Sequence, residues 1–133
     1  MSAIVVDTSA LVEYLFRTRE SDRVAEVLEE PSTEIHVPEL CDIEFVSALR
    51  QAMIRRVFTE DAALVVLFDY GQLALRRHGH LELMLRILDL RDNLTAYDAA
   101  FVALAERLSV PLVTVDQRLL RAVRAHTDVQ VIP

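Results

Sequence analysis

Four acidic residues of the chain stand where a carboxylate has no obvious partner. Asp7 and Asp116 each follow a short apolar run, and Glu44 and Asp98 lie in segments with helical spacing of apolar residues. No arginine stands three or four residues from Glu44 or Asp98, the positions that normally pair a charge on a helix. A bound divalent cation would supply the missing countercharge. Oxygen ligands without a cysteine or histidine set favour a hard ion, Mg2+ or Mn2+, over zinc.

Each of these acids also has an ordinary structural interpretation. Asp7 and Asp116 stand after apolar runs, where aspartate is a favoured N-cap of the following helix. Asp98 comes three residues after Thr95, so the pair resembles a capping box with aspartate in the usual glutamate position. Glu44 fits a solvated side chain. The spacing alone leaves open whether the four acids meet at one site.

Short apolar runs alternate with amphipathic segments along the chain. The runs predict strands at residues 3–6, 34–37, 112–115 and 129–132. Helical spacing and capping residues predict helices that begin near residues 8, 21, 38, 59, 80, 95 and 117. Strands separated by helices predict an α/β fold with a short, mostly parallel sheet covered on both faces. Ligands of such sheets bind beyond the carboxyl ends of the strands, where Asp7 and Asp116 stand.

Length and composition exclude several classes of protein. A chain of 133 residues, with no linker or repeat, suits one domain spanning residues 1–133. All 14 basic residues are arginine, so mechanisms that need a catalytic ammonium group are excluded. Two isolated glycines cannot build a phosphate-binding glycine loop. The net charge of −7 argues against a generic basic nucleic-acid binder.

The chain has no sequence feature of export or membrane insertion. Cys41 is the single cysteine, which excludes a disulfide framework and suits a reducing cytoplasm. The apolar run at residues 62–68 is far shorter than the roughly 20 residues of a membrane helix. No basic region precedes the N-terminal apolar stretch, and Asp7 interrupts it early, so we expect no signal peptide. We therefore expect a cytoplasmic protein that does not span a membrane.

Four segments of the chain resemble the motifs of PIN-domain nucleases, particularly the VapC toxins of type II toxin–antitoxin pairs. Residues 4–12 contain the Asp7-Thr8-Ser9 sequence of the first motif, and residues 38–49 place Glu44 in the second. Residues 94–105, with Asp98, resemble the third motif closely, and residues 112–116 end in the aspartate of the fourth. The third segment is the most specific of the four. The resemblance covers nearly the whole chain, in the same order.

The resemblance implies a PIN-like three-layer α/β/α sandwich and a metal-dependent endoribonuclease. In this family the cut in RNA leaves a 5′-phosphate and a 3′-hydroxyl. The resemblance implies that Asp7 and Asp98 are the principal ligands of one or two Mg2+ or Mn2+ ions. Glu44 and Asp116 would be further ligands, either direct or through water, and one of them could orient the attacking water. All four acids are thus candidate catalytic residues.

Hydroxyl groups and protein partners also follow from the resemblance. Thr114 is expected to hydrogen-bond a carboxylate or the scissile phosphate, and Thr8 or Ser9 to do so from the first turn of a helix. The family implies a homodimer and a cognate VapB-like antitoxin that silences the enzyme. Ordinary core packing is the alternative explanation for the many aliphatic residues in the helices near residues 10–28 and 40–54.

Several arginines are candidates for RNA contact. Many relatives carry another acid just after the fourth aspartate, but Gln117 and Arg118 stand here, which leaves a second metal ion in doubt. Arg118 fits either a phosphate contact or a solvated position. Arg76 and Arg77 open the basic stretch 76–80, which predicts an exposed loop and could touch RNA phosphates. Its two histidines lack an evident third zinc ligand. The last predicted helix carries a basic edge near the fourth aspartate: Arg118, Arg121 and Arg124.

Two other functions remain as alternatives. The first is a non-catalytic PIN scaffold that binds RNA or protein, and the presence of all four acids argues against it. The second is a metal-dependent phosphatase on a similar sheet. The absence of lysine and the third segment count against that function. The RNA target cannot be identified from short motifs, because RNA selectivity depends on shape and surface contacts.

Overall fold

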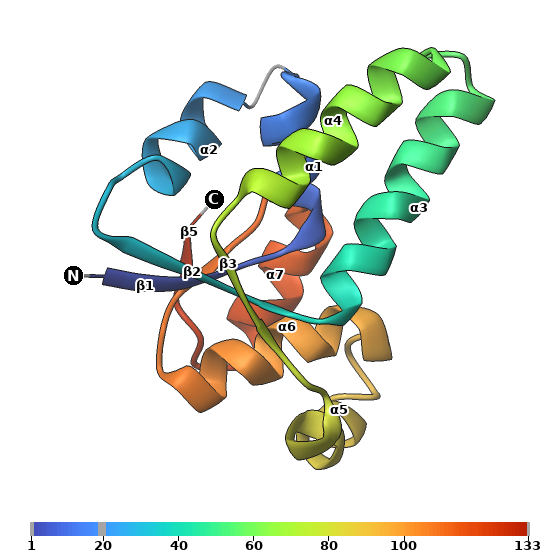
Figure 1. The fold of residues 1–133 in the computed structure, drawn as a ribbon. Helices are drawn as coiled ribbons and strands as arrows, with labels where there is room; N and C mark the ends of the chain where they lie inside the picture. The colour runs from blue at the N-terminus through green and yellow to red at the C-terminus, as the bar shows by residue number, and fades with distance from the viewer. Residues whose placement is uncertain (1, 19–20, 133) are drawn as a thin grey trace.

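A computed structural model describes residues 2–18 and 21–132 of the chain. Its five strands are all parallel and lie in the order β3-β2-β1-β4-β5 (Figure 1). The strands are β1 (Ser2–Val6), β2 (Thr33–Pro38), β3 (Leu75–His78), β4 (Leu112–Val113) and β5 (Val131–Ile132). The helices are α1 (Thr8–Phe16), α2 (Ser21–Leu28), α3 (Leu40–Ile54), α4 (Glu60–Gln72), α5 (Met84–Asp89), α6 (Ala96–Leu108) and α7 (Gln117–His126), with a 3-10 turn η1 (Leu81–Leu83) before α5.

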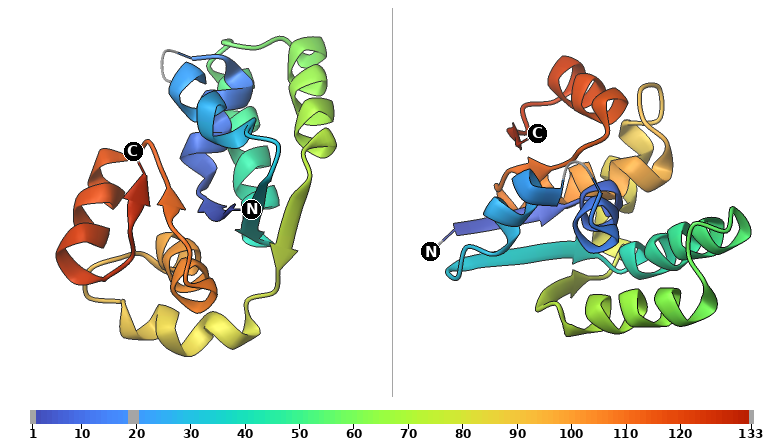
Figure 2. Two further views of the ribbon diagram at one scale, coloured as in Figure 1. Left: turned by 90° about the vertical axis from the view of Figure 1, so that its left-hand side faces the viewer. Right: turned by 90° about the horizontal axis from the view of Figure 1, so that it is seen from above.

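The sheet is the middle of three layers. Helices α1 to α4 lie on one side of it and α5 to α7 on the other (Figure 2). Helix α6 is buried continuously from residue 99 to residue 105, because its small alanines let it pack closely against the sheet. The α/β class and the three layers predicted from the sequence are thus confirmed. Within the described residues no helix is long and apolar enough to span a membrane.

The chain reverses its direction of sheet building between β1 and β4. Strands β2 and β3 extend the sheet from one side of β1, whereas β4 and β5 extend it from the other. Val5 lies opposite Leu112 and Val6 opposite Val113, and the N–H of Asp7 donates to the carbonyl of Val113 at 3.0 Å. A crevice forms at such a switch point because the connections leave in opposite directions. The ends of β1 and β4 therefore deliver their next residues to one place.

Several predicted boundaries were wrong, the most consequential at residues 76–80. The predicted exposed loop contains most of strand β3, which pairs with β2 at the edge of the sheet. Charged side chains are typical of an edge strand, since they discourage pairing with another chain. The helix predicted from residue 80 is divided into η1 and α5. Pro38 ends β2 instead of opening α3, and β4 and β5 are shorter than predicted.

Candidate active site

Asp7 is a buried carboxylate at the carboxyl end of β1. Its side chain is only 5% exposed and caps α1 by accepting from the N–H of Ala10 at 3.0 Å. The same carboxylate accepts from Thr114 Oγ1 at 2.6 Å and from Ser9 Oγ at 2.7 Å. Burial raises the pKa of Asp7 to about 6, although these three hydrogen bonds lower it and the charge of Asp116 adds a further increase. The chain therefore maintains a carboxylate where ionisation is unfavourable.

Thr114 and Ser9 hold the two strand ends together. Each hydroxyl donates to Asp7 and accepts a backbone N–H from the segment after β4. The N–H of Asp116 donates to Thr114 Oγ1 at 3.0 Å, and the N–H of Val115 donates to Ser9 Oγ at 3.3 Å. A hydroxyl that donates once and accepts once fixes both its partners. The expected contact between Thr114 and a carboxylate is thus present, and its partner is Asp7.

Glu44 approaches the same edge from the second turn of α3. Thr8 Oγ1, in the first turn of α1, donates to Glu44 Oε1 at 2.6 Å. Burial raises the pKa of the half-buried Glu44, the hydrogen bond from Thr8 lowers it, and the charge of Asp98 raises it. Glu44 is therefore oriented by a neighbouring element and not freely solvated.

Asp98 and Asp116 occupy the first turn of α6 and the N-cap of α7. Thr95 caps α6 by accepting the N–H of Asp98 at 3.1 Å, so this part of the predicted capping box is confirmed. Asp116 Oδ1 accepts the N–H groups of Arg118 and Leu119, at 3.0 and 3.2 Å. Burial raises the pKa of Asp98, the charge of Asp116 raises it further, and the charge of Arg118 lowers it. Asp98 and Asp116 thus cap or begin helices and also feel each other's charge.

The four acids share one electrostatic environment. The charge of Asp116 raises the pKa of both Asp7 and Asp98, and that of Asp98 raises the pKa of Glu44. Like charges raise one another's pKa only when they lie close together. The sequence left their convergence open, and these couplings bring all four to one edge of the sheet.

The donor set fits a hard divalent cation. Glu44 Oε2 and Asp116 Oδ2 accept no hydrogen bond from the described residues, and Asp7 Oδ2 accepts only from Thr114. Each oxygen therefore keeps a lone pair for a ligand. Across residues 2–18 and 21–132, no three acid, histidine or cysteine side chains are already drawn together tightly enough to hold a metal ion. A cation would thus have to draw these carboxylates inward.

The basic residues of β3 are engaged elsewhere. Arg76 pairs with Glu34 at 3.1 Å, and Arg77 forms a two-pronged contact with Asp42 at 2.8 and 3.0 Å. Tyr70 also donates to Asp42, at 2.6 Å, so this cluster ties β3 to α3 and α4. RNA contact by Arg76 or Arg77 stays a prediction. The cluster was missed by sequence reasoning, since its members are separated by up to 35 residues and show no common motif.

The two histidines of the 76–80 stretch do not act together. His80 Nε2 accepts the backbone N–H of Leu40 at 3.0 Å, which places this ring at the start of α3. His78 Nε2 instead lies 2.8 Å from Nδ1 of His36 on β2. The two rings therefore have different partners, which agrees with the sequence interpretation that they do not form a zinc site.

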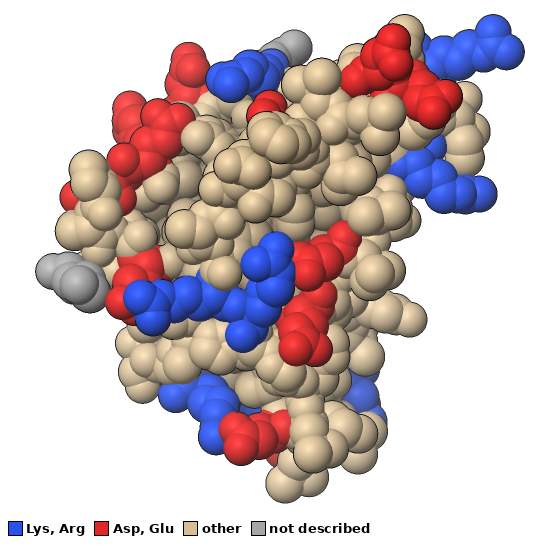
Figure 3. All heavy atoms as spheres, in the orientation of Figure 1, with Lys and Arg blue, Asp and Glu red and all other residues tan. Residues whose placement is uncertain are grey.

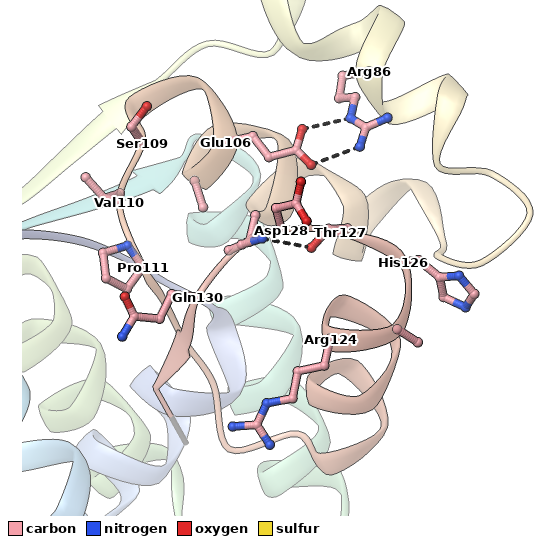
Figure 4. A pocket seen from close by; sticks show the side chains of 13 residues that line it. Arg86, Glu106, Ser109, Val110, Pro111, Arg124, His126, Thr127, Asp128 and Gln130 are labelled. Atoms are coloured by element: carbon pink, nitrogen blue, oxygen red, sulfur yellow. Dashed lines mark hydrogen bonds and ion pairs between the residues drawn. The ribbon is translucent and has the colours of Figure 1, made fainter.

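The largest cavity lies away from the acids. It has a volume of about 1040 Å³ and is lined by the end of α6, the end of α7 and the residues that precede β4 and β5 (Figure 4). Arg86 and Glu106 form a paired contact at its rim, with distances of 2.7 and 2.9 Å. Since the acids stand at the opposite ends of the strands, cavity size does not identify the reactive centre here.

Comparisons with known proteins agree with this geometry. Residues 4–125 match the sequence profile of the PIN domain. The chain is 35% identical over 129 residues to Ribonuclease VapC12 of Mycobacterium tuberculosis, covering 97% of this chain and 98% of that protein.

Two solved structures share the fold. The structure of VapBC2 from Rickettsia felis, bound to a DNA fragment from their promoter, gives a TM-score of 0.70 at 12% identity, over 98% of this chain and 97% of that one. VapC20 of Mycobacterium tuberculosis, described as a sarcin–ricin loop cleaving toxin, gives 0.68 at 13% identity, over 90% and 94%. The buried Asp7 after β1, the three acids coupled to it and the full-length sequence match lead to one conclusion: the chain belongs to the PIN-domain family, within its VapC group.

Proposed function

We propose that this protein is a VapC-like toxin, a metal-dependent endoribonuclease that hydrolyses phosphodiester bonds of RNA in the cytoplasm. The observation that carries the proposal is the coupling of four carboxylates at the switch point, with Thr114 and Thr8 orienting two of them. The names of the relatives support the substrate, since VapC12 is called a ribonuclease and VapC20 a sarcin–ricin loop cleaving toxin.

Asp7 and Asp98 would be the principal ligands of Mg2+ or Mn2+, and Glu44 and Asp116 would bind directly or through water. When bound, the ion supplies Lewis-acid chemistry at the phosphodiester and lowers the pKa of a water molecule. The protein contributes orientation and a low-dielectric setting. Because burial alone raises the pKa of Asp7 to about 6, a nearby cation is what keeps this carboxylate charged at neutral pH.

The hydroxyl groups act as positioning residues in this proposal. Thr114 fixes one oxygen of Asp7 and Ser9 fixes the other, so the carboxylate cannot rotate. Thr8 holds Oε1 of Glu44 and leaves Oε2 available. Groups that orient a ligand determine how well the site is preorganised. These three hydroxyls therefore decide where the two carboxylates point before RNA arrives.

The proposed activity is tested by incubating the purified protein, free of any antitoxin, with total cellular RNA and mapping the new ends. We expect discrete cuts with Mg2+ or Mn2+, with 5′-phosphate ends, and none with EDTA. RNA that stays intact with every metal would favour a non-catalytic scaffold. Release of phosphate from small phosphomonoesters, without cuts in RNA, would favour a phosphatase.

We further propose a homodimer that a VapB-like antitoxin silences. The VapBC2 structure supports the second partner, since its description names the pair together. Large apolar side chains are exposed in two regions, which provides one surface for each partner. The first region covers α3 and α4: Ile43, Val46, Met53, Ile54, Val57, Leu64, Val65, Leu67 and Phe68. The second covers η1 and α5: Leu81, Met84, Leu85 and Leu88.

Charge substitutions in the two regions test both partners. We expect Phe68→Glu and Leu85→Glu to affect different assemblies, one the dimer and the other the antitoxin complex. Light scattering reports the mass of the free protein, and co-purification reports the antitoxin complex. A monomeric wild-type protein would contradict the homodimer. A dimer and a complex that both survive each substitution would show that these regions serve neither partner.

A further inference from the structure

Helix α7 carries an exposed row of arginines that the acid cluster does not explain. Arg118, Arg121 and Arg124 are all exposed, and we call them the α7 ridge. Their spacing of three residues places them on one side of the helix, over an axial length of about 9 Å. The opposite side of α7 is buried through Leu119, Leu120 and Val123. The helix itself contains no acidic residue.

The ridge is little neutralised by neighbouring carboxylates. Among the described residues, Arg121 and Arg124 have no ion-pair partner. Arg118 is 77% exposed and approaches Asp98 only to 3.9 Å. The acids nearest in sequence are Asp116, whose carboxylate caps the helix, and Asp128 beyond its end. In a chain of net charge −7, this segment holds three arginines against two aspartates.

Other arginines of the protein are already occupied. Four of them are committed to ion pairs with acidic side chains: Arg76, Arg77, Arg86 and Arg107. On the face of the molecule seen in Figure 3, basic and acidic groups lie against one another and form no continuous basic patch. Arginines without acidic partners are the ones free to bind an external anion.

The ridge also starts at the acid cluster. Asp116 belongs to the cluster and caps α7, so the first turn of the helix and the carboxylates are fixed together. Arg118, at that first turn, lies nearest to Asp98. The ridge ends at Arg124, which extends from α7 beside the cavity of about 1040 Å³ (Figure 4). A strand of RNA cleaved at the acids would therefore meet successive arginines along α7.

We infer that the α7 ridge binds the phosphates of the RNA strand next to the cleaved bond. The inference rests on the proposed ribonuclease function and adds to it the surface that holds the substrate. It explains how a protein with a net charge of −7 binds a polyanion, because the positive charge is concentrated beside the acids. Arg121 and Arg124 lie beyond the acids and contribute to binding alone.

The test compares two double variants with equal loss of charge. Arg121→Gln with Arg124→Gln removes two arginines of the ridge. Arg50→Gln with Arg55→Gln is the control, since both arginines are exposed on or just after α3. Binding of a fluorescent single-stranded RNA oligonucleotide is measured by anisotropy in EDTA over a series of salt concentrations. Cleavage of the same RNA with Mn2+ gives kcat and KM, and circular dichroism verifies folding.

We expect the ridge variant to bind RNA about tenfold more weakly at low salt, with a higher KM and an unchanged kcat. Its plot of log affinity against log salt should be shallower by about 1.4, since each lost phosphate contact on a single strand removes about 0.7. The control variant should match the wild type.

Wild-type affinity and salt dependence in the ridge variant would overturn the inference, as would equal losses in both variants. If the ridge variant kept its RNA affinity but escaped antitoxin inhibition, the ridge would serve an acidic peptide and the inference would also be wrong. A wild-type protein that binds RNA through the ridge but cuts no RNA with any metal would refute the proposed function and leave the ridge in place.

Discussion

Thr114 donates a 2.6 Å hydrogen bond to Asp7, a residue 107 positions earlier in the chain, and both side chains are buried. The bond joins the carboxyl ends of β1 and β4, the two strands between which the sheet reverses direction. One buried hydroxyl thereby fixes the carboxylate that the proposed metal needs and the backbone that leads to Asp116. The position of the site is therefore a property of the sheet as well as of its loops.

Replacing Thr114 with valine should destabilise the protein and disturb Asp7. Valine has nearly the same shape but leaves the buried Asp7 oxygen and the N–H of Asp116 without their partner. We expect a loss of about 1–3 kcal/mol in the free energy of unfolding, measured in urea. Thr114→Ser keeps the hydroxyl and should recover most of that loss. Equal stability of the valine and serine variants would show that the hydrogen bond contributes nothing.

Asp7 should make the stability of the metal-free protein fall as pH rises. The pKa of Asp7 is raised from 3.8 to about 6 in the folded state, so the folded protein holds this proton more tightly than the unfolded chain. The stabilisation is present below pH 4, declines between pH 4 and 6, and is absent above pH 6. The full change is on the order of 3 kcal/mol.

Asp7→Asn isolates this effect, because all other titrating groups remain. The difference in unfolding free energy between wild type and variant, measured in EDTA from pH 4 to 7, should follow the titration of Asp7. The variant should be at least as stable as the wild type at pH 7. A difference that does not vary with pH would contradict the raised pKa of Asp7.

Metal binding should stabilise the folded protein through the acid cluster. A ligand at a hundredfold excess over its Kd adds about 2.7 kcal/mol to the free energy of unfolding. We expect Mn2+ to raise the Tm of the wild type, and to raise that of Asp98→Asn much less. Asp128→Asn is the matched control, since Asp128 is exposed and lies outside the cluster. Equal Tm shifts in all three proteins would indicate that the ion binds elsewhere.

Arg77 should matter for stability more than Arg76. Arg77 holds Asp42, which also accepts the hydroxyl of Tyr70, so its loss loosens the contact of β3 with α3 and α4. Because both charges are partly exposed, we expect Arg77→Gln to cost only about 1 kcal/mol in urea unfolding. Arg76→Gln should change stability by less than about 0.5 kcal/mol. A larger effect from Arg76 would reverse these assignments.

The sequence predicted the fold where local signals and burial agree. Thr95 and the apolar residues after it predicted a helix at 95–109, and α6 spans Ala96–Leu108. Strand β3 was missed because it is short, basic and lacks alternating apolar residues. It exists through its pairing with β2 and the contact of Arg77 with Asp42, both of which depend on the folded chain.

The candidate site shows the same division. Asp7 and Asp116 could be placed at the edge of the sheet, since each follows a predicted strand. The partners of the acids could not be predicted in the same way. Thr8 and Glu44 are 36 residues apart, and Thr114 and Asp7 are 107 apart, so tertiary structure alone brings them together. Sequence therefore identified the acids, and the fold determines which hydroxyl orients each one.

The measurement that tests the central claim most directly is RNA cleavage by Asp98→Asn beside the wild type. Asp98 lies in the first turn of α6, where asparagine preserves the backbone cap made by Thr95. The substitution should therefore keep the fold, verified by circular dichroism. We expect cleavage by the wild type with Mn2+, none with EDTA, and a rate at least roughly a hundredfold lower for the variant. A folded variant that cuts RNA at the wild-type rate, or wild-type cleavage that persists in EDTA, would contradict the account.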